Sequence, residues 1–285
     1  WFIDNGWSIK KLNHLIISSA AYQRSSHHPS PDLVTKLDPT QALYSTFKPR
    51  RLTAEELRDA MLIASGELNR EIGGLSARPD INLEVARQPL QIMGGSASVY
   101  ESDPTPDQRN RRSLYAEKLR GLRDPFFETF NQPGSTNSCE IRETSTVAPQ
   151  ALTLINSQEM HDRALAFAHR LAKETQDDKQ VIKRAFQLAL GRAPTPKEAF
   201  IFLEAWRTAT SDESTLSPKN SLPPNSIMRT VRAEKTGEFY TFKEFLPVSK
   251  LYKADLDRSL CDARIRGLSH LCLVIFNSNE FAYLD

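Results

Sequence analysis

A capping box constrains the fold of this chain more directly than any other sequence feature, because it fixes where a helix begins. Thr53 precedes Glu56 by three residues, the spacing at which each side chain satisfies a free backbone N–H of the first turn. Leu57 and Met61 then follow four residues apart, on one face of that helix. We therefore predict an amphipathic helix that ends near Gly66 and buries this face in a core.

Apolar residues recur at helical spacing along most of the chain, so we predict a mainly α-helical fold with minor strand content. The further predicted helices cover residues 8–22, 124–130, 147–155, 157–174, 178–190, 194–208 and 256–277. In the last of them we expect five apolar residues to dock on the other helices: Leu260, Leu268, Leu271, Val274 and Ile275. Residues 111–119 alternate and are predicted to be extended, whereas residues 239–242 suggest a strand or hairpin arm.

A long loop-rich middle interrupts the predicted helices. Gly73 and Gly74 open a stretch that runs to about Asn110, is rich in proline and glycine, and has no clear periodicity. Loops of this length inside a compact domain are usually functional or partly disordered. Residues 211–252 are polar and at first proline-rich, and we interpret them as an insertion into a single domain of residues 1–285.

Composition and motifs exclude several classes of function. The 285 residues include 37 Lys and Arg against 35 Asp and Glu, which gives a net charge of only +2. No segment concentrates the basic residues, so we predict no nucleic-acid partner. No run approaches the ~20 apolar residues of a membrane-spanning helix. The sequence also contains no phosphate-binding glycine-rich loop, serine-esterase motif or zinc-protease motif.

The histidines are too scattered to predict a metal site. His27 and His28 are adjacent in a proline-rich loop and lack partners at ligand spacing. His161 and His169 fall ~12 Å apart along one predicted helix, which is too far to hold one ion. We therefore expect no metal and no cofactor in this chain.

The three cysteines allow two interpretations. Cys139, Cys261 and Cys272 are too few for a disulfide scaffold, and we expect them to be small buried residues. The alternative is that Cys139 acts as a nucleophile. That role requires a positioned base, and no histidine stands near Cys139 in the sequence.

Glu55, Arg58 and Asp59 share one face of the first predicted helix, because they stand three and four residues apart. Two carboxylates beside a guanidinium are what a carbohydrate-active enzyme would use for acid–base chemistry, so Glu55 and Asp59 are candidate catalytic residues. The alternative is a structural network in which these carboxylates pair with Arg111 or Arg112.

A second constellation lies at residues 138–156. One of the three hydroxyl residues Thr144, Ser145 and Thr146 is predicted to cap the helix that begins near Val147. Free backbone N–H groups at that helix start, together with Arg142, would suit a carboxylate, sulfate or phosphate. In the alternative interpretation Arg142 pairs with Glu55 or Asp59, and the hydroxyls serve only as caps.

Five ordered groups of residues carry a resemblance to a known family. They are Arg50-Arg51-Leu52 with Ala54-Glu55 and Arg58-Asp59; Arg111-Arg112-Ser113 with Tyr115; Cys139 and Arg142 with Thr144-Ser145-Thr146; Gln150-Ala151-Leu152 with Leu154 and Asn156-Ser157; and Leu190-Gly191-Arg192 with Pro194-Thr195. In this order they resemble the bacterial family called domain of unknown function 1553, typical of planctomycetes. The resemblance runs from Gly6 to Asp285. Asn131 departs from it, because the family usually has an acidic residue there.

The resemblance implies a setting rather than a reaction. It implies one family domain without its N-terminal part, a periplasmic or cell-surface location, an upstream cytochrome-like module that could carry haem, and a link to complex-carbohydrate degradation. The anchors supply these candidate ligand-binding residues: Arg50, Arg51, Arg58, Arg111, Arg112, Tyr115, Arg142, Thr144, Ser145, Gln150 and Asn156. Three functions stay open: a binding or scaffolding module for a carbohydrate or anionic ligand, a carbohydrate-active enzyme, and a purely structural assembly domain.

Overall fold

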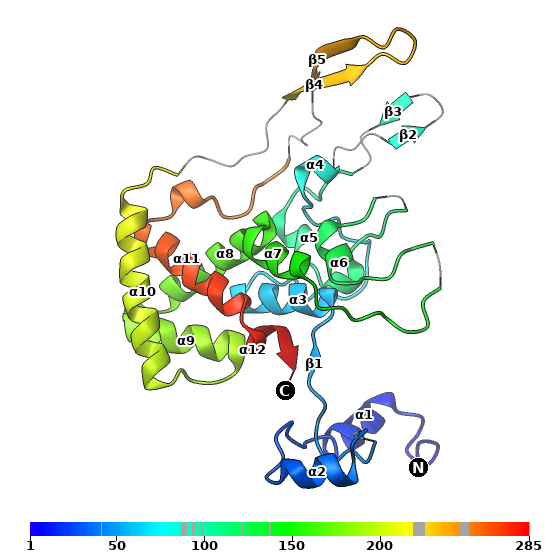
Figure 1. Cartoon of the computed structure of the whole chain (residues 1–285), viewed down its shortest axis with the longest axis vertical. Helices are drawn as coiled ribbons and strands as arrows, with labels where there is room; N and C mark the ends of the chain where they lie inside the picture. Colours follow the sequence, from blue (N-terminus) through cyan, green and yellow to red (C-terminus); the bar gives the residue numbers. More distant parts are fainter. Residues whose placement is uncertain are drawn as a thin grey trace. The chain divides into compact units, whose positions relative to one another are not determined.

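The computed structural model describes residues 1–40, 42–86, 90–92, 95–97, 100–120, 122–136, 138–218, 226–245 and 251–284 (Figure 1). The chain forms two compact units. The smaller unit comprises Trp1–Leu52 with Ala282–Asp285, and the larger unit comprises Thr53–Phe281.

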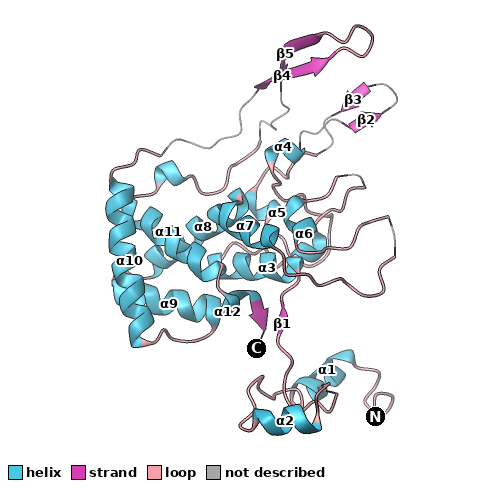
Figure 2. Cartoon of the chain, viewed as in Figure 1, coloured by secondary structure: helices cyan, strands magenta, loops and turns pink. Residues whose placement is uncertain are grey.

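Helices make up most of the regular structure, which confirms the predicted mainly α-helical fold (Figure 2). The helices are α1 (Ile9–Ile17), α2 (Pro31–Leu37), α3 (Ala54–Ser65), α4 (Leu83–Ala86), α5 (Pro106–Arg109), α6 (Pro125–Thr129), α7 (Ala148–Asn156), α8 (Gln158–Glu174), α9 (Asp178–Leu190), α10 (Pro196–Ser214), α11 (Ala263–Phe276) and α12 (Asn279–Ala282), with short 3₁₀ turns η1 (Ser113–Tyr115) and η2 (Arg258–Leu260). The described strands form three antiparallel pairs: β1 (Arg50–Arg51) with β6 (Tyr283–Leu284), β2 (Leu90–Ile92) with β3 (Gly95–Ala97), and β4 (Ser226–Arg232) with β5 (Phe239–Phe245).

The core of the larger unit lies where α8 packs against α3 and α11, while α10 packs against α11 (Figure 1). Phe167 of α8 and Phe276 of α11 are fully buried and stack with ring centroids 5.5 Å apart. Leu57 and Met61 bring the apolar face of α3 into the same core. Each such side chain contributes about 1.5–3 kcal/mol of burial free energy, which is why tertiary packing holds these helices together.

The predicted capping box is present at the start of α3. Thr53 Oγ1 accepts the N–H of Glu56, and Glu56 Oε2 accepts the N–H of Thr53 at 2.9 Å. Gly66 ends the helix with φ of 80°, a left-handed conformation that glycine adopts without steric cost. The prediction of this helix is confirmed at both ends.

A close backbone approach joins α10 to α11. A Cβ atom at Gly267 would lie 2.7 Å from both the backbone nitrogen and Oγ1 of Thr210, so only glycine fits there. Nearby, the buried carboxylate of Glu213 accepts hydrogen bonds from Arg266 and Arg258 and contacts Nε2 of His270 at 2.8 Å. Charge pairing therefore fixes the register of the two helices at the point where they come closest.

The smaller unit has little interior of its own. Ser8 caps α1 as predicted, accepting the N–H of Lys11. Asp38 is the one buried side chain among the described residues of this unit, and it accepts backbone hydrogen bonds from Ala42 and Leu43. Its stability must come from local hydrogen bonding more than from apolar burial.

Several predicted boundaries were wrong. The first helix ends at Ile17 instead of about residue 22, and the helix predicted to stop at residue 208 runs on to Ser214. The segment at 111–119, predicted to be extended, forms isolated bridges through Arg111 and Ala116, but its centre is the 3₁₀ turn η1. The last long helix begins at Ala263, seven residues later than predicted, since Asp262 caps it there.

The predicted docking of the last helix is partly confirmed. Leu268, Leu271 and Ile275 are buried as expected. Leu260 and Val274 are exposed, because the first precedes the helix in η2 and the second lies on its outer face. Local spacing identified the buried stripe but not its limits.

The hairpin arm predicted around residues 239–242 is present as β4 and β5. It lies within the expected insertion of residues 211–252, of which residues 219–225 and 246–250 are outside the described residues. The long middle stretch that opens at Gly73 is irregular as predicted, interrupted by short elements from α4 to α5.

Candidate functional site

Arg142 and Glu55 form a clamp between a long loop and the first turn of α3. The two terminal nitrogens of Arg142 donate to the two oxygens of Glu55 at 2.7 and 2.8 Å, and Gln132 Nε2 donates to Glu55 Oε1 at 3.0 Å. Burial alone would raise the pKa of Glu55, but these hydrogen bonds outweigh it and lower the pKa to about 2. An ionised carboxylate held this way is engaged internally, which agrees with the ion-pair interpretation of Arg142.

Arg58 and Asp59 organise the loop that follows α5. The buried Arg58 guanidinium donates to the carbonyl oxygens of Arg109 and Arg111 at 2.8 and 3.0 Å, and to Ser113 Oγ at 3.2 Å. Asp59 Oδ1 accepts the N–H of Ser113 at 2.7 Å. Both side chains therefore satisfy backbone groups that a helix or sheet does not satisfy.

Arg111 serves a similar structural purpose. Its guanidinium donates to the carbonyl oxygens of Leu75 and Gly73 and lies 4.2 Å from the centroid of the Tyr115 ring. Tyr115 in turn accepts the N–H of Gly73 through its hydroxyl oxygen at 2.9 Å. Arg112 differs, since its side chain is half exposed and its Nε lies 3.9 Å from Asp59.

Asn131 forms hydrogen bonds with two of the predicted polar residues near the start of α7. Its Oδ1 accepts from Ser145 Oγ at 2.8 Å and from Gln150 Nε2 at 3.2 Å, and its φ of 62° is a left-handed conformation that asparagine tolerates. The prediction that a hydroxyl residue caps this helix was wrong. Val147 is the N-cap, and its N–H donates to Gln150 Oε1 at 3.4 Å. Ser145 instead joins the helix to the Asn131 turn.

The remaining candidates are dispersed. Thr144 is exposed before the start of α7, and Asn156 is exposed at the last residue of α7. Arg50 and Arg51 form β1 in the smaller unit, paired with Leu284 and Tyr283.

The three cysteines differ in burial. Cys261 and Cys272 are buried as expected, but Cys139 is exposed in the loop before Arg142. Its thiol donates to the carbonyl oxygen of Ile141 at 3.2 Å. The expectation of three buried cysteines was therefore wrong for Cys139, because it stands in an exposed loop.

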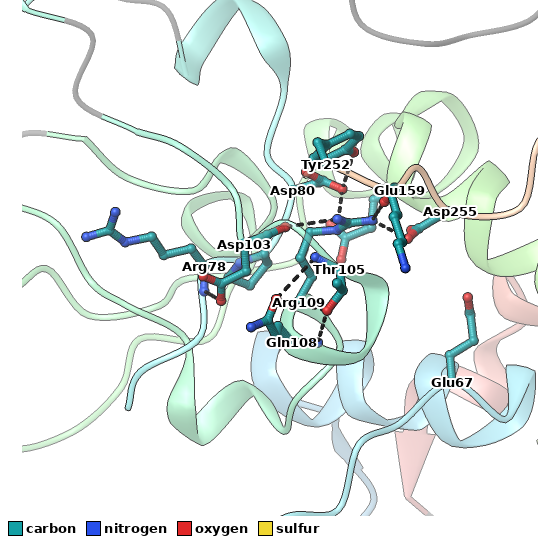
Figure 3. Close-up of polar contacts among 12 residues, drawn as sticks. Glu67, Arg78, Asp80, Asp103, Thr105, Gln108, Arg109, Glu159, Tyr252 and Asp255 are labelled. Carbon is teal, nitrogen blue, oxygen red and sulfur yellow. Dashed lines mark hydrogen bonds and ion pairs between the residues drawn. The ribbon is translucent and has the colours of Figure 1, made fainter. Parts of the chain in front are cut away.

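The most concentrated polar structure was not among the predicted sites. Its centre is Arg109, at the end of α5, which is 1% exposed. Figure 3 shows its guanidinium between the carboxylates of Asp80 and Asp255, with closest N···O distances of 2.7 Å to each, while Tyr252 donates to Asp80 at 3.0 Å. The guanidinium also lies 4.6 Å from the Tyr252 ring centroid. We call this the Arg109 cluster, and it comprises Arg58, Arg109, Arg163, Glu67, Asp80, Asp124, Glu159, Asp162, Tyr252 and Asp255.

Asp255 connects Arg109 to a second buried arginine. Arg163 of α8 pairs with Asp255 Oδ2 and, at 2.8 Å, with Glu67 Oε2. Burial opposes ionisation of Asp255, but the two guanidiniums lower its pKa below the ordinary value. Glu67 behaves differently, because burial outweighs Arg163 and raises its pKa. These alternating basic and acidic side chains connect segments that are far apart in the sequence.

The acidic side of the cluster is crowded with carboxyl groups. Glu159, whose Oε1 lies 3.3 Å from Arg58 Nε, has its pKa raised to about 7 by burial and by the neighbouring charge of Asp124. Burial also raises the pKa of Asp162 to about 6 and that of Asp80 and Asp124 above the ordinary value. Six carboxyl groups face three guanidiniums, and burial shifts the pKa of five of these carboxyl groups towards the protonated form.

Sequence reasoning missed the Arg109 cluster for an identifiable reason. Its members come from loops and helices up to 197 residues apart, from Arg58 to Asp255, and no local pattern joins them. Thr105 and Gln108 do form a second capping box, which could have located Arg109 at the end of a short helix. Tyr252 is the last residue of the stretch we interpreted as an insertion, and Asp255 follows it.

Neither metal binding nor membrane crossing has support in the described part of the chain. No group of three or more His, Cys, Asp or Glu side chains there has a geometry suited to a metal ion. None of the helices that can be described is both long and apolar enough to span a membrane. The carboxyl groups of the Arg109 cluster can accept hydrogen bonds and transfer protons.

Comparison with known proteins places the chain in a family. The family model described as "Protein of unknown function (DUF1553)" matches residues 1–206. The chain belongs to the DUF1553 family. The DUF1553 match ends within α10, so β4, β5 and α11 follow it, whereas the resemblance in the sequence continues to Asp285.

No further relative defines the activity. No curated protein and no solved structure matches the chain significantly. The DUF1553 match itself includes α3, the Arg142 clamp and every arginine of the Arg109 cluster, but not Tyr252 or Asp255.

Proposed function

We propose that this domain is a binding module for a hydroxyl-rich ligand, a carbohydrate, and that the Arg109 cluster is its binding site. The observation that carries the proposal is the pair of carboxylates, Asp80 and Asp255, held in fixed positions on the fully buried Arg109. The Asp80 side chain remains 41% exposed. A rigid acceptor that faces solvent, as Asp80 does, lowers the entropic cost of binding.

Hydrogen-bond capacity favours sugar hydroxyls as the donors. An ionised carboxylate accepts about four hydrogen bonds, and the contacts of Asp80 with Arg109 and Tyr252 use only part of that capacity. Tyr252 adds an aromatic ring beside the same acceptors. A polyol with neighbouring hydroxyl groups complements this arrangement.

The charge of the Arg109 cluster disfavours an anionic ligand, which is the other ligand class that the sequence left open. The cluster has more carboxyl groups than guanidiniums, and its arginines already contact carboxylates or carbonyl oxygens. At the other predicted site, an anion would have to displace Glu55 from Arg142. Acidic and sulfated sugars should therefore bind more weakly than neutral ones.

Thermal melting of the whole chain against neutral, acidic and sulfated oligosaccharides tests this function, because a ligand raises stability by RT ln(1 + [L]/Kd). We expect neutral sugars to raise the melting temperature. Asp80→Asn should weaken binding about 10-fold, and Glu128→Gln, an exposed change on α6, should leave it unchanged. A sharp melt that no sugar shifts would contradict binding and favour a purely structural assembly domain.

A second candidate, a carbohydrate-active enzyme, rests on one observation at the same cluster. Glu159 has a pKa of about 7 and can donate a proton at neutral pH, while Asp255 stays ionised. Glycoside hydrolysis uses a protonated and an ionised carboxyl group in this way. The earlier candidates suit it less, because Glu55 is clamped by Arg142 and Asp59 accepts a backbone N–H.

Turnover distinguishes the two functions. An enzyme would release sugar products, and Glu159→Gln would reduce the rate at least 100-fold while sugar binding persisted. Binding without products from any oligosaccharide of the panel would reject the enzyme and leave the binding module.

The setting proposed from the family resemblance is extracytoplasmic, beside an upstream cytochrome-like module that could carry haem. Fractionation of a native host and co-purification of a haem protein with this chain would test both parts. Recovery of the chain in the cytoplasm without haem protein would reject them.

A further inference from the structure

The apolar face of α1 is exposed to solvent. Ile9 and Ile16 fall within about 20° of each other on the helix and are 68% and 47% exposed. Leu15 and Ile17 lie about 100° to either side of Ile16 and are 47% and 52% exposed. A helix of nine residues is marginal in water unless packing covers its apolar face. The described residues of the smaller unit supply no apolar core, since Asp38 is its one buried side chain. Burial of this face against a further surface would stabilise the helix.

Aromatic side chains flank the exposed helix. Trp1 and Trp7 precede α1 and are 53% and 65% exposed, and Tyr22 follows it with 59% exposed. Phe2 packs edge-on against Trp7, with ring centroids 5.4 Å apart. Tryptophan and tyrosine favour the boundary between apolar lipid and water, because they combine an apolar ring with a polar group.

The charges around α1 have one sign. Lys10 and Lys11 are neighbours on the side of the helix opposite Ile9 and Ile16. No Asp or Glu occurs between residues 5 and 31, where Lys10, Lys11 and Arg24 are basic. The surface beside the apolar face therefore complements a negatively charged surface.

We propose that α1 binds the surface of an anionic lipid bilayer, with its apolar face among the acyl chains and Lys10 and Lys11 at the headgroups. A basic polar face, an apolar opposite face and flanking aromatic residues are the features of helices that lie in a membrane interface. The helix is ~13.5 Å long at 1.5 Å per residue, so it lies in the interface and does not cross the bilayer. This inference is independent of carbohydrate binding by the larger unit.

Vesicle co-sedimentation of the whole chain tests the proposal. We expect binding to vesicles of equal parts phosphatidylglycerol and phosphatidylcholine, weaker binding at high salt, and little binding to pure phosphatidylcholine. Trp7 should give a blue-shifted emission on binding, while the buried Trp206 should not respond. Lys10→Gln combined with Lys11→Gln should lower the partition coefficient about 30-fold, from ~1 kcal/mol per basic residue.

Two further variants separate the helix from general charge effects. Lys179→Gln with Lys183→Gln makes the same charge change on the exposed side of α9 and should leave binding within about twofold. Ile16→Asn alters an exposed residue, so it should preserve the fold and still weaken vesicle binding. Absence of binding to the anionic vesicles, equal loss in the α9 variant, or dimers that occlude α1 would overturn the proposal.

Discussion

Arg142 and Glu55 are 87 residues apart in the chain and are joined by two parallel hydrogen bonds of 2.7 and 2.8 Å. Arg142→Ala should lower the free energy of unfolding by about 1–2 kcal/mol, because it removes a bidentate charged pair. Urea denaturation gives the loss, and a double-mutant cycle with Glu55→Gln gives the coupling between the two residues. Arg112→Ala is the matched control and should cost less than about 1 kcal/mol. Equal losses at both arginines would contradict the assignment.

Removal of Arg109 should be far more costly. Arg109→Met leaves Asp80 and Asp255 without their shared buried partner, and we expect a loss of about 3–5 kcal/mol. The control is Arg184→Met on α9, whose partner Glu174 is partly exposed, with an expected loss below about 1 kcal/mol. Chemical denaturation of the two variants side by side decides this, and similar stabilities would show that the cluster is not a structural centre.

Gly267 should not tolerate a methyl group. Gly267→Ala places a Cβ atom 2.7 Å from the backbone of Thr210 and should cost about 1–3 kcal/mol as α10 and α11 separate. Gly134→Ala is the control, because the nearest atom to its Cβ is Thr136 Oγ1 at 3.9 Å. A melting temperature unchanged by Gly267→Ala would mean that these helices pack differently.

Glu159 should make stability fall as pH rises. Its folded pKa of about 7 exceeds the ordinary value of 4.5, so the folded protein binds more protons than the unfolded chain between these values. The contribution is fully present below about pH 4.5 and is lost on the way to pH 7, by at most about 3 kcal/mol. Glu159→Gln should flatten this slope in denaturation curves measured across that range. An identical slope in the variant would contradict the assignment.

Glu55 should act in the opposite direction. Its pKa is lowered from 4.5 to about 2, so the unfolded chain binds the extra proton in that range. The stabilisation is present above about pH 4.5 and disappears as the pH falls towards 2. Glu55→Gln should therefore lose less stability on acidification than the unaltered chain, as followed by far-ultraviolet circular dichroism. A steeper acid loss in the variant would reverse the sign and reject this account.

Local sequence patterns could predict helices whose start is encoded within four residues. Thr53 with Glu56 located α3, and Asp124 before Pro125 located α6. The start of α7 was mispredicted because three hydroxyl residues competed as caps and Asn131, sixteen residues before Val147, engages Ser145 instead. A contact of that kind cannot be read from spacing.

The amino-acid sequence by itself determined the mainly helical character and most helix starts, because these depend on neighbouring residues. It left the role of Arg142 open between an anion site and an ion pair, and the structure decided for the pair with Glu55. Tertiary structure alone decided the Arg109 cluster, since Asp80, Arg109 and Asp255 meet only after long loops close around α8. Burial and neighbouring charge in that cluster also decided the direction in which the pKa of each carboxyl group shifts. Desolvation and neighbouring charge depend on position in space, and no local pattern of residues specifies them.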